Sequence, residues 1–206
     1  MKQMKPGTKF CTACGHDQTA VTPDPHHLIP GTKLRDRYTV GNVLGEGGFG
    51  ITYVGWDSLF DRKVAIKEFY MAGYVSRIST YSPSVQVSMG NYAELFEKTR
   101  SRFLDEAKVL ARFQSEDGIV GIQDFFQENN TAYNVMDFLD GETLKSYLKR
   151  SGKLSWEQAR TLMLPVLKSL SKVHAHHIIH RDISPDNIML TRDGKVKLLD
   201  VGAARD

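Results

Sequence analysis

The 206 residues carry 27 Lys and Arg against 24 Asp and Glu, which gives a net charge of +3 with no long basic block. This weak balance argues against a nucleic-acid-binding protein, and no apolar run approaches the roughly 18 residues that a membrane helix needs. Hydrophobic residues make up 41%, enough for a buried core in one large domain or two small ones. The first residues form no apolar signal segment and there are only two cysteines, so we expect a cytoplasmic protein without a disulfide framework.

Residues 1–34 differ from the rest in containing both cysteines, Cys11 and Cys14, in a C-x-x-C pattern followed by a proline-rich linker. The pattern resembles half of a zinc ribbon, whereas structural zinc takes four ligands. Three histidines follow that could complete the site, at spacings that fit no standard pattern: His16, His26 and His27. Zn²⁺ at Cys11 and Cys14 and free thiols in a tail both remain open interpretations.

Five segments have the composition of β-strands. Tyr38–Leu44 and Ile51–Val54 flank a glycine-rich turn, and Lys63–Lys67 alternates and is rich in β-branched residues. Two further strands are predicted on either side of Asn129-Asn130, the second ending at Tyr133–Met136. We expect these strands to form one antiparallel sheet.

The segment 70–93 has no clear period and is interpreted as a long connection. A helix is predicted after it, because five residues recur on one helical face: Phe103, Leu104, Ala107, Leu110 and Ala111. At about 100° per residue, Glu106 falls beside this apolar face and Asp105 points away from it.

The last third of the chain is predicted to be mostly helical. A short helix contains Leu144, and a longer one begins at Ser155, which forms a capping box with Gln158. A hairpin is predicted to close at 192–194 between Ile188 and Leu199. The pattern indicates an α+β protein with a five-stranded antiparallel sheet and one helix in residues 35–139, and a partial, mainly helical lobe in residues 140–206.

The turn between the first two strands reads Gly45-Glu46-Gly47-Gly48-Phe49-Gly50. Glycines let the backbone approach a polyphosphate and direct amide N–H groups at it. A tight hairpin also uses glycine, so the motif alone is weak. The dinucleotide-binding interpretation fails, because it needs a helix directly after the glycines and Ile51–Val54 is strand-like.

Lys67 ends the third strand, 20 residues beyond Gly47. A lysine in Val-Ala-Ile-Lys after a glycine-rich strand-turn-strand can reach the α- and β-phosphates of a nucleotide. Such a lysine needs an acidic partner to hold it, and Glu106 is the better placed of the two acids on the predicted helix.

The most specific signal is the run from His180 to Asn187, followed by Asp200-Val201-Gly202. Phosphoryl transfer needs a carboxylate to orient the attacking hydroxyl and oxygen ligands for Mg²⁺. Asp182 can serve the first purpose, and Asn187 and Asp200 the second.

From Tyr38 to Arg205 the sequence resembles a eukaryotic-type protein kinase, and more closely the bacterial Ser/Thr kinases. The resemblance implies that the glycine-rich turn covers the ATP phosphates and that Lys67 pairs with Glu106. It also implies that Asp182 is the catalytic base and that Asn187 and Asp200 are the Mg²⁺ ligands.

The same resemblance implies a slot for adenine. Met136 stands at the gatekeeper position, and the backbone of Asp137 to Leu139 forms the hinge that contacts the base. The side chains implied to line the slot are Leu44, Thr52, Ala65 and Met189.

Some positions depart from the family pattern. Ser184 stands where most Ser/Thr kinases carry a lysine, and Val201 replaces the usual phenylalanine, while Pro185 favours the Ser/Thr type over the Tyr type. The resemblance also implies truncation just after Asp200. From this we expect a chain that is weakly stable or aggregates, exposes apolar residues such as Leu162 and Leu167, and does not turn over protein substrates.

The leading hypothesis is an ATP- and Mg²⁺-dependent kinase that acts on Ser or Thr hydroxyls of a protein substrate. A nucleotide-binding pseudokinase or scaffold is the main alternative, favoured by Ser184 and Val201 and opposed by retention of every catalytic group. A small-molecule phosphotransferase and a zinc-ribbon adaptor are weaker alternatives, the latter supported only by Cys11 and Cys14.

Overall fold

The computed structural model describes residues 24–79, 81–88, 90 and 92–199. The chain divides into two compact units. The first contains the residues up to Phe96 together with 127–131, and the second contains residues 97–126 and those from Ala132 onward. The predicted domain boundary between residues 139 and 140 stays a prediction.

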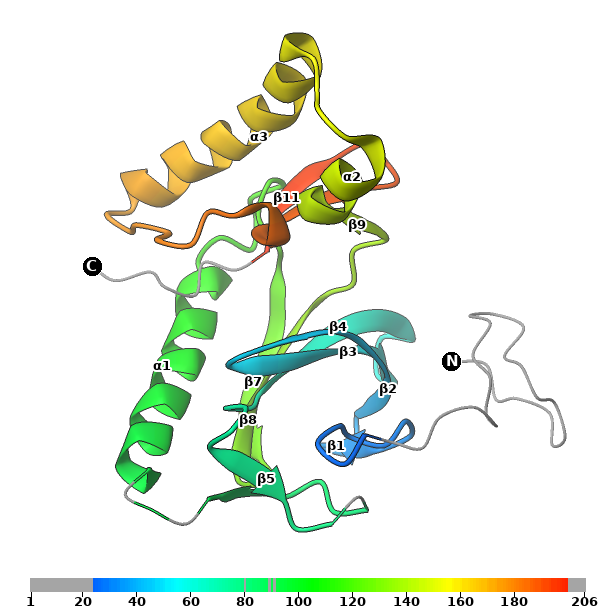
Figure 1. Ribbon diagram of the computed structural model, residues 1–206, viewed down its shortest axis with the longest axis vertical. Coiled ribbons are helices and arrows are strands. Elements are labelled where there is room, and N and C mark those ends of the chain that lie inside the picture. Colours follow the sequence, from blue (N-terminus) through cyan, green and yellow to red (C-terminus); the bar gives the residue numbers. More distant parts are fainter. Residues whose placement is uncertain (1–23, 80, 89, 91, 200–206) are drawn as a thin grey trace, which may run out of the picture. The chain divides into compact units, whose positions relative to one another are not determined.

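The first unit is built on an antiparallel sheet (Figure 1). Its strands are β1 (Lys33–Leu34), β2 (Tyr38–Gly47), β3 (Gly50–Asp57) and β4 (Arg62–Phe69). The full sheet order is β1-β2-β3-β4-β8-β7. The last two strands, β7 (Ile122–Glu128) and β8 (Thr131–Asp137), belong mostly to the second unit. All five predicted strands are therefore confirmed. The additional strand β1 has only two residues, too few to show a period.

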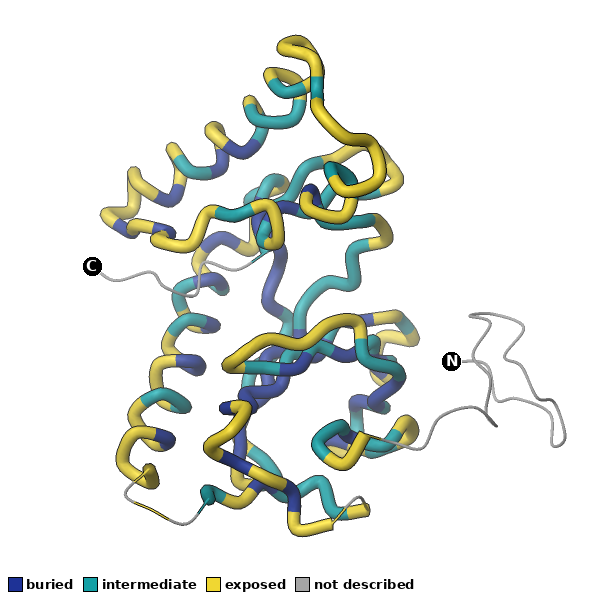
Figure 2. Tube along the Cα trace, in the orientation of Figure 1, coloured by how far each residue is buried: buried dark blue, intermediate teal, exposed yellow. Residues whose placement is uncertain are grey.

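Alternation along β3 and β4 separates two faces of the sheet (Figure 2). Ile51, Tyr53, Val64 and Ile66 are almost completely buried, whereas the residues between them are only half-buried. Because successive side chains of a strand point to opposite faces, one face forms the core of the unit and the other remains accessible.

The segment predicted as a long connection contains a second, two-stranded sheet. β5 (Val75–Arg77) pairs antiparallel with β6 (Val85–Val87). The connection therefore contains two strands that the sequence did not predict, because strands of three residues are too short for a hydrophobic period to be read.

Helix α1 (Ala93–Ala111) begins in the first unit and continues in the second. Four of its five predicted core residues are buried: Phe103, Leu104, Ala107 and Leu110. Ala111 is half-buried. The apolar period therefore predicted the buried face of the helix correctly.

Among its described residues, the second unit has two clusters of buried hydrophobic residues. The first contains Leu110, Phe113, Ile119, Ile122, Val173 and Ile178. The second contains Leu144, Val166, Ile188 and Leu198. Part of these residues come from helices α2 (Leu144–Ser151) and α3 (Trp156–Ala175). Others come from strands β10 (Ile188–Thr191) and β11 (Val196–Leu198). These two strands form a three-stranded sheet with β9 (Gly141–Thr143).

Helix α3 begins with the predicted capping box. The Ser155 side chain accepts from the Gln158 backbone N–H, and the Gln158 side chain accepts from the Ser155 backbone N–H. Leu167 is 56% exposed as expected, but Leu162 packs against the second cluster, so the expectation for Leu162 was wrong. Among the described helices, none combines the length and the hydropathy of a membrane span.

Candidate active site

The first unit supplies the glycine-rich turn, which is closed by the pair Gly47 and Gly50 at the ends of β2 and β3. A Cβ built on Gly45, Gly47 or Gly48 would meet no atom within 4 Å, and none of the three has a positive φ. A Cβ on Gly50 would lie 2.9 Å from the carbonyl oxygen of Glu68. Packing therefore requires glycine only at Gly50, and the open space at the other three suits the close approach of a ligand to the backbone.

Three predicted nucleotide-binding side chains share the accessible face of the sheet. Thr52 on β3 lies directly opposite Lys67 on β4, and Val54 lies opposite Ala65. All are half-buried. A Cβ built on Gly50 would lie 3.6 Å from Cε of Lys67, so the lysine stem runs beside the glycine-rich turn.

Two predicted nucleotide-binding residues with apolar side chains, one from the adenine slot and one from the glycine-rich turn, are largely exposed in the first unit. Leu44 is 53% exposed and Phe49, at the tip of the turn, is 64% exposed. Exposed side chains of this size next to polar strands are available to cover an apolar ring such as a nucleobase.

Glu46 differs from its neighbours, because its side chain is bound by two histidines that precede the sheet. Its Oε2 lies 2.7 Å from His27 Nε2 and 3.3 Å from His26 Nε2. Hydrogen bonding to His27, then to His26, lowers the pKa of Glu46 below its ordinary 4.5. Glu46 pairs with the buried Ile51, so its side chain belongs to the face opposite Lys67, and a role in nucleotide binding would fall to its backbone amide.

The second unit supplies the loop before the 3₁₀ turn η1 (Pro185–Asn187). Asn187 Nδ2 donates to Asp182 Oδ2 at 2.8 Å and to the Asp182 carbonyl at 3.0 Å. The structure thus brings together the predicted base and one predicted metal ligand. Asp182 itself is exposed. A catalytic base must be accessible to its substrate, so this exposure is compatible with the predicted role.

The backbone before Asp182 is held in an unusual conformation. Arg181 has φ 61°, in the left-handed region that non-glycine residues seldom adopt. His180 is only 1% exposed, and its Nδ1 accepts from the Asp182 backbone N–H at 3.4 Å. His180 is therefore a packing element that fixes the loop, and strain of this kind is concentrated at functional sites.

One polar contact at this loop was not predicted from the sequence. Lys145 Nζ on α2 lies 2.9 Å from Asp186 Oδ2 in η1. Both side chains are more than half exposed, so the pair adds little stability, but it joins α2 to the loop. No sequence signal links two residues that lie 41 positions apart.

The predicted hinge follows β8 in the second unit. Met136 packs against the first hydrophobic cluster. The Asp137 backbone N–H donates to the Gly121 carbonyl at 3.0 Å, and Gln123 Nε2 donates to Asp137 Oδ1 at 2.6 Å. Leu139 and Met189 are half-buried, Met189 on β10 opposite Thr143. The Asp137 side chain is thus held within its own unit. Any contact between the hinge and an adenine ring would therefore be made by backbone groups, as the sequence predicts.

Some predicted contacts and ligands of the site stay predictions. Lys67 belongs to the first unit and the half-buried Glu106 to the second, so their ion pair stays a prediction. Asp200, Cys11 and Cys14 lie outside the described residues.

A comparison with family models matches residues 38–206 to the protein kinase domain. The chain belongs to the protein kinase family. This kinase is 35% identical over 177 residues to the serine/threonine-protein kinase PknA of Nostoc sp. and 33% identical over 176 residues to the probable serine/threonine-protein kinase PknB of Lactococcus lactis. It is 30% identical over 177 residues to PrkC of Bacillus subtilis.

These matches cover 84%, 85% and 86% of the kinase chain but only 28%, 25% and 24% of the three relatives. The chain thus spans about a quarter of the length of these relatives. Among solved structures, the kinase is similar to the apo form of PpkA-294, with a TM-score of 0.78 and 31% identity, over 86% of this chain and 62% of that one. The eukaryotic-type kinase fold and family expected from the sequence are confirmed.

Proposed function

We propose that this kinase transfers the γ-phosphoryl group of ATP to Ser or Thr hydroxyls of a protein. The contact between Asp182 and Asn187 carries the proposal most directly, because it joins a carboxylate that can orient a hydroxyl to an amide that can ligate a metal. The curated relatives, which are named as serine/threonine-protein kinases, support the acceptor class.

In this proposal the first unit holds the phosphates. The open space beside Gly45, Gly47 and Gly48 fits a polyphosphate against the backbone, and the Lys67 ammonium lies on the accessible face next to the turn. Glu106 would hold the lysine in its extended conformation.

The second unit would position the acceptor. Asp182, oriented by Asn187 Nδ2, accepts a hydrogen bond from the attacking hydroxyl and takes its proton as the oxygen bonds to phosphorus. The ADP oxygen leaves as that bond forms. The rate then derives from positioning and charge neutralisation rather than from a covalent enzyme intermediate.

A magnesium ion fits the donor set of this loop. The Asn187 amide oxygen remains available for a metal, since its nitrogen is the atom that binds Asp182, and hard oxygen donors are the ligands that Mg²⁺ prefers. Asn187 and Asp200 would hold the ion, which would neutralise part of the charge on the phosphates.

A nucleotide-binding pseudokinase is the second candidate, and one position favours it. Ser184 caps η1 without a side-chain hydrogen bond, and a neutral residue there supplies no cation for the γ-phosphate. ATP binding without transfer is the outcome that separates this candidate from the active kinase.

The proposal is tested with γ-labelled ATP, the natural full-length protein that contains this chain, and a mixture of Ser- and Thr-containing peptides. Asp182→Asn is expected to lower kcat by about 10²–10⁴ while ATP binding is retained. Asp193→Asn is a matched control, since Asp193 lies in the exposed turn between β10 and β11. Equal labelling by both variants would remove Asp182 from the catalytic role.

A further inference from the structure

Four polar side chains meet where the segment before the sheet reaches the glycine-rich turn. His26 Nδ1 lies 2.5 Å from Asp24 Oδ1, while His26 Nε2 and His27 Nε2 lie 3.3 and 2.7 Å from Glu46 Oε2. The candidate ligand atoms of Asp24, His26 and His27 all lie within 4.8 Å of one another. Asp24, His26 and His27 therefore lie at mutual ligand spacing, and Glu46 Oε2 is within 3.3 Å of both imidazoles.

The ring of His26 faces a carboxylate with each of its nitrogens. A neutral imidazole carries only one N–H, so one of the two nitrogens would direct a lone pair at a carboxylate oxygen. The repulsion between this lone pair and the carboxylate oxygen is removed when a cation lies between the ring nitrogen and that oxygen. Either a second proton or a metal ion can serve.

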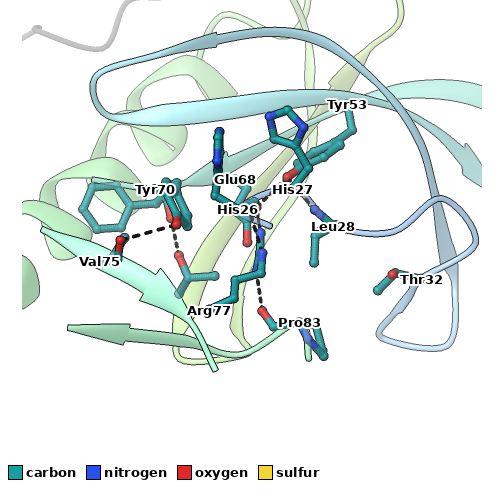
Figure 3. A network of polar contacts seen from close by, with 12 residues as sticks. His26, His27, Leu28, Thr32, Tyr53, Glu68, Tyr70, Val75, Arg77 and Pro83 are labelled. Carbon is teal, nitrogen blue, oxygen red and sulfur yellow. Dashed lines mark hydrogen bonds and ion pairs between the residues drawn. The ribbon is translucent and has the colours of Figure 1, made fainter. Parts of the chain in front are cut away.

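The backbone beside the two histidines is held by a buried polar network (Figure 3). The His26 carbonyl accepts from Arg77 Nε at 3.0 Å, and Arg77 pairs at 2.6 Å with Glu68, whose side chain is fully buried. The Leu28 backbone N–H, next to His27, donates to the Tyr53 hydroxyl at 3.1 Å. A fixed backbone reduces the reorganisation that the two side chains need to bind an ion.

We propose that His26 Nε2, His27 Nε2 and Glu46 Oε2 form a site for a divalent transition metal of the zinc class, oriented by Asp24. Two imidazole nitrogens and one carboxylate oxygen are a ligand set that suits zinc. Bonds of about 2.0–2.1 Å at tetrahedral angles place ligand atoms roughly 3.3 Å apart. The His26 to Glu46 distance matches this spacing, and the His27 to Glu46 distance requires only a small opening.

Asp24 is assigned to the outer shell rather than to the metal. Its oxygen lies 2.5 Å from Nδ1 of His26, on the opposite side of the ring from Nε2. A carboxylate that accepts from the distal N–H of a metal-bound histidine fixes the tautomer and the ring orientation. The site therefore requires neither Cys11 nor Cys14.

The metal would tie the segment that contains His26 and His27 to the glycine-rich turn. Glu46 lies between Gly45 and Gly47, and its side chain belongs to the face opposite Lys67. A metal at this position would restrict the turn and leave the Lys67 face open. The inference is thus separate from the proposed catalytic reaction.

The test uses zinc alone and the full chain with Cys11→Ser and Cys14→Ser, so that thiols cannot bind the probe. Competition with a chromophoric chelator is expected to give one zinc per chain. His27→Ala and Glu46→Gln should each weaken binding about tenfold or more, and Asp24→Asn should weaken it by about tenfold. His174→Ala, which removes an exposed histidine of α3, is the matched control and should change nothing.

Hydrogen exchange supplies a second measurement that needs no activity. Zinc should slow exchange of the backbone amides of residues 46–50 in the cysteine-free chain and not in its Glu46→Gln variant. Absence of zinc binding would mean that the cluster is held by protons alone and would overturn the site. Equal binding by a His26→Ala/His27→Ala variant would also overturn it, and zinc binding without protection of the turn would overturn the tie to Glu46.

Discussion

At the scale of single residues, the glycines of the turn have different reasons to be glycine. Gly50 is constrained by packing, because a Cβ there would lie 2.9 Å from the Glu68 carbonyl oxygen. Gly47 is not constrained, because a Cβ there would enter open space. One of these positions therefore serves the fold, and the other is free to serve a ligand.

Gly50→Ala is expected to lower the free energy of unfolding by about 1–3 kcal/mol, since backbone atoms must shift to admit the methyl group. Gly47→Ala should change it by less than about 0.5 kcal/mol and instead weaken ATP binding. Chemical denaturation and ATP titration of both variants separate the two effects. A Gly47→Ala protein with normal ATP affinity would contradict the assigned role of the turn.

Asp57 is a second residue whose role is decided by its surroundings. It is fully buried and accepts two hydrogen bonds from Arg37, at 2.8 and 2.7 Å, and one from the Leu59 backbone N–H at 3.0 Å. The Arg37 hydrogen bond is the main cause that holds the pKa of Asp57 below its ordinary 3.8.

Because the folded-state pKa is lowered, the unfolded chain binds more protons in the acid range, and stability must rise with pH there. The contribution of Asp57 is complete above pH 3.8 and is lost as the pH falls toward the lower folded value. Asp57→Asn should lower the free energy of unfolding at neutral pH. Breaking a buried ion pair costs about 3–5 kcal/mol, and we expect a value toward the lower end because Arg37 is 26% exposed to solvent.

The measurement is urea denaturation of wild type and Asp57→Asn at pH 7 and at pH 3. The stability difference should shrink at the lower pH. Asp61→Asn, in the exposed turn after β3, serves as the control. A difference that does not change with pH would show that packing rather than charge explains the loss.

At the scale of elements, local patterns predicted long elements better than short ones. The turn Asn129-Asn130 has φ values of 55° and 56°, the left-handed conformation that asparagine tolerates, and its two strands were predicted. β5 and β6 were missed, because their stability depends on contacts distant in sequence, such as the bond from the Val85 N–H to the Asn129 carbonyl.

The candidate site shows the same division. The sequence singled out Lys67, Asp182 and Asn187 as candidates because their chemistry and order are specific. The structure brings the last two together, and their roles stay predictions. The sequence did not predict the contact of Lys145 with Asp186, or the contacts of the His26 and His27 imidazoles with the Glu46 carboxylate. Those contacts depend on the path of the backbone, which residue types alone do not specify.

Helix α3 offers a test at this scale. Ser155→Ala removes the oxygen that accepts from the Gln158 N–H at 3.2 Å, and it should cost about 1 kcal/mol of stability. The control is Ser171→Ala, an exposed position inside the same helix, where alanine should be neutral or slightly stabilising. Faster hydrogen exchange at Gln158 in the first variant alone would confirm the cap. No change in that exchange would contradict it.

At the scale of the whole molecule, distant parts of the chain are joined by buried polar contacts in the first unit. Arg77 from β5 donates to Glu68 of β4, to the His26 carbonyl and to the Pro83 carbonyl. The Tyr53 hydroxyl donates to Glu68 at 2.9 Å, and burial, then the nearby Glu68 charge, raises the pKa of Tyr53 so that it stays protonated. These contacts make residues 24–32 an integral part of the unit that carries the glycine-rich turn.

Replacement of Arg77 should therefore affect a large part of this unit. Arg77→Leu leaves the Glu68 carboxylate buried without its charged partner and should lower the free energy of unfolding by about 3–5 kcal/mol. Arg77→Leu combined with Glu68→Gln removes the unpaired charge and should recover part of that loss. The control Arg112→Leu, at an exposed position after α1, should stay within about 0.5 kcal/mol.

Hydrogen exchange at Leu28, whose N–H is bound by Tyr53, should speed up in the single variant, because the segment loses its anchor at the His26 carbonyl. If Leu28 kept its protection while the rest of the first unit lost stability, residues 24–32 would be held by apolar packing and not by the Arg77 network.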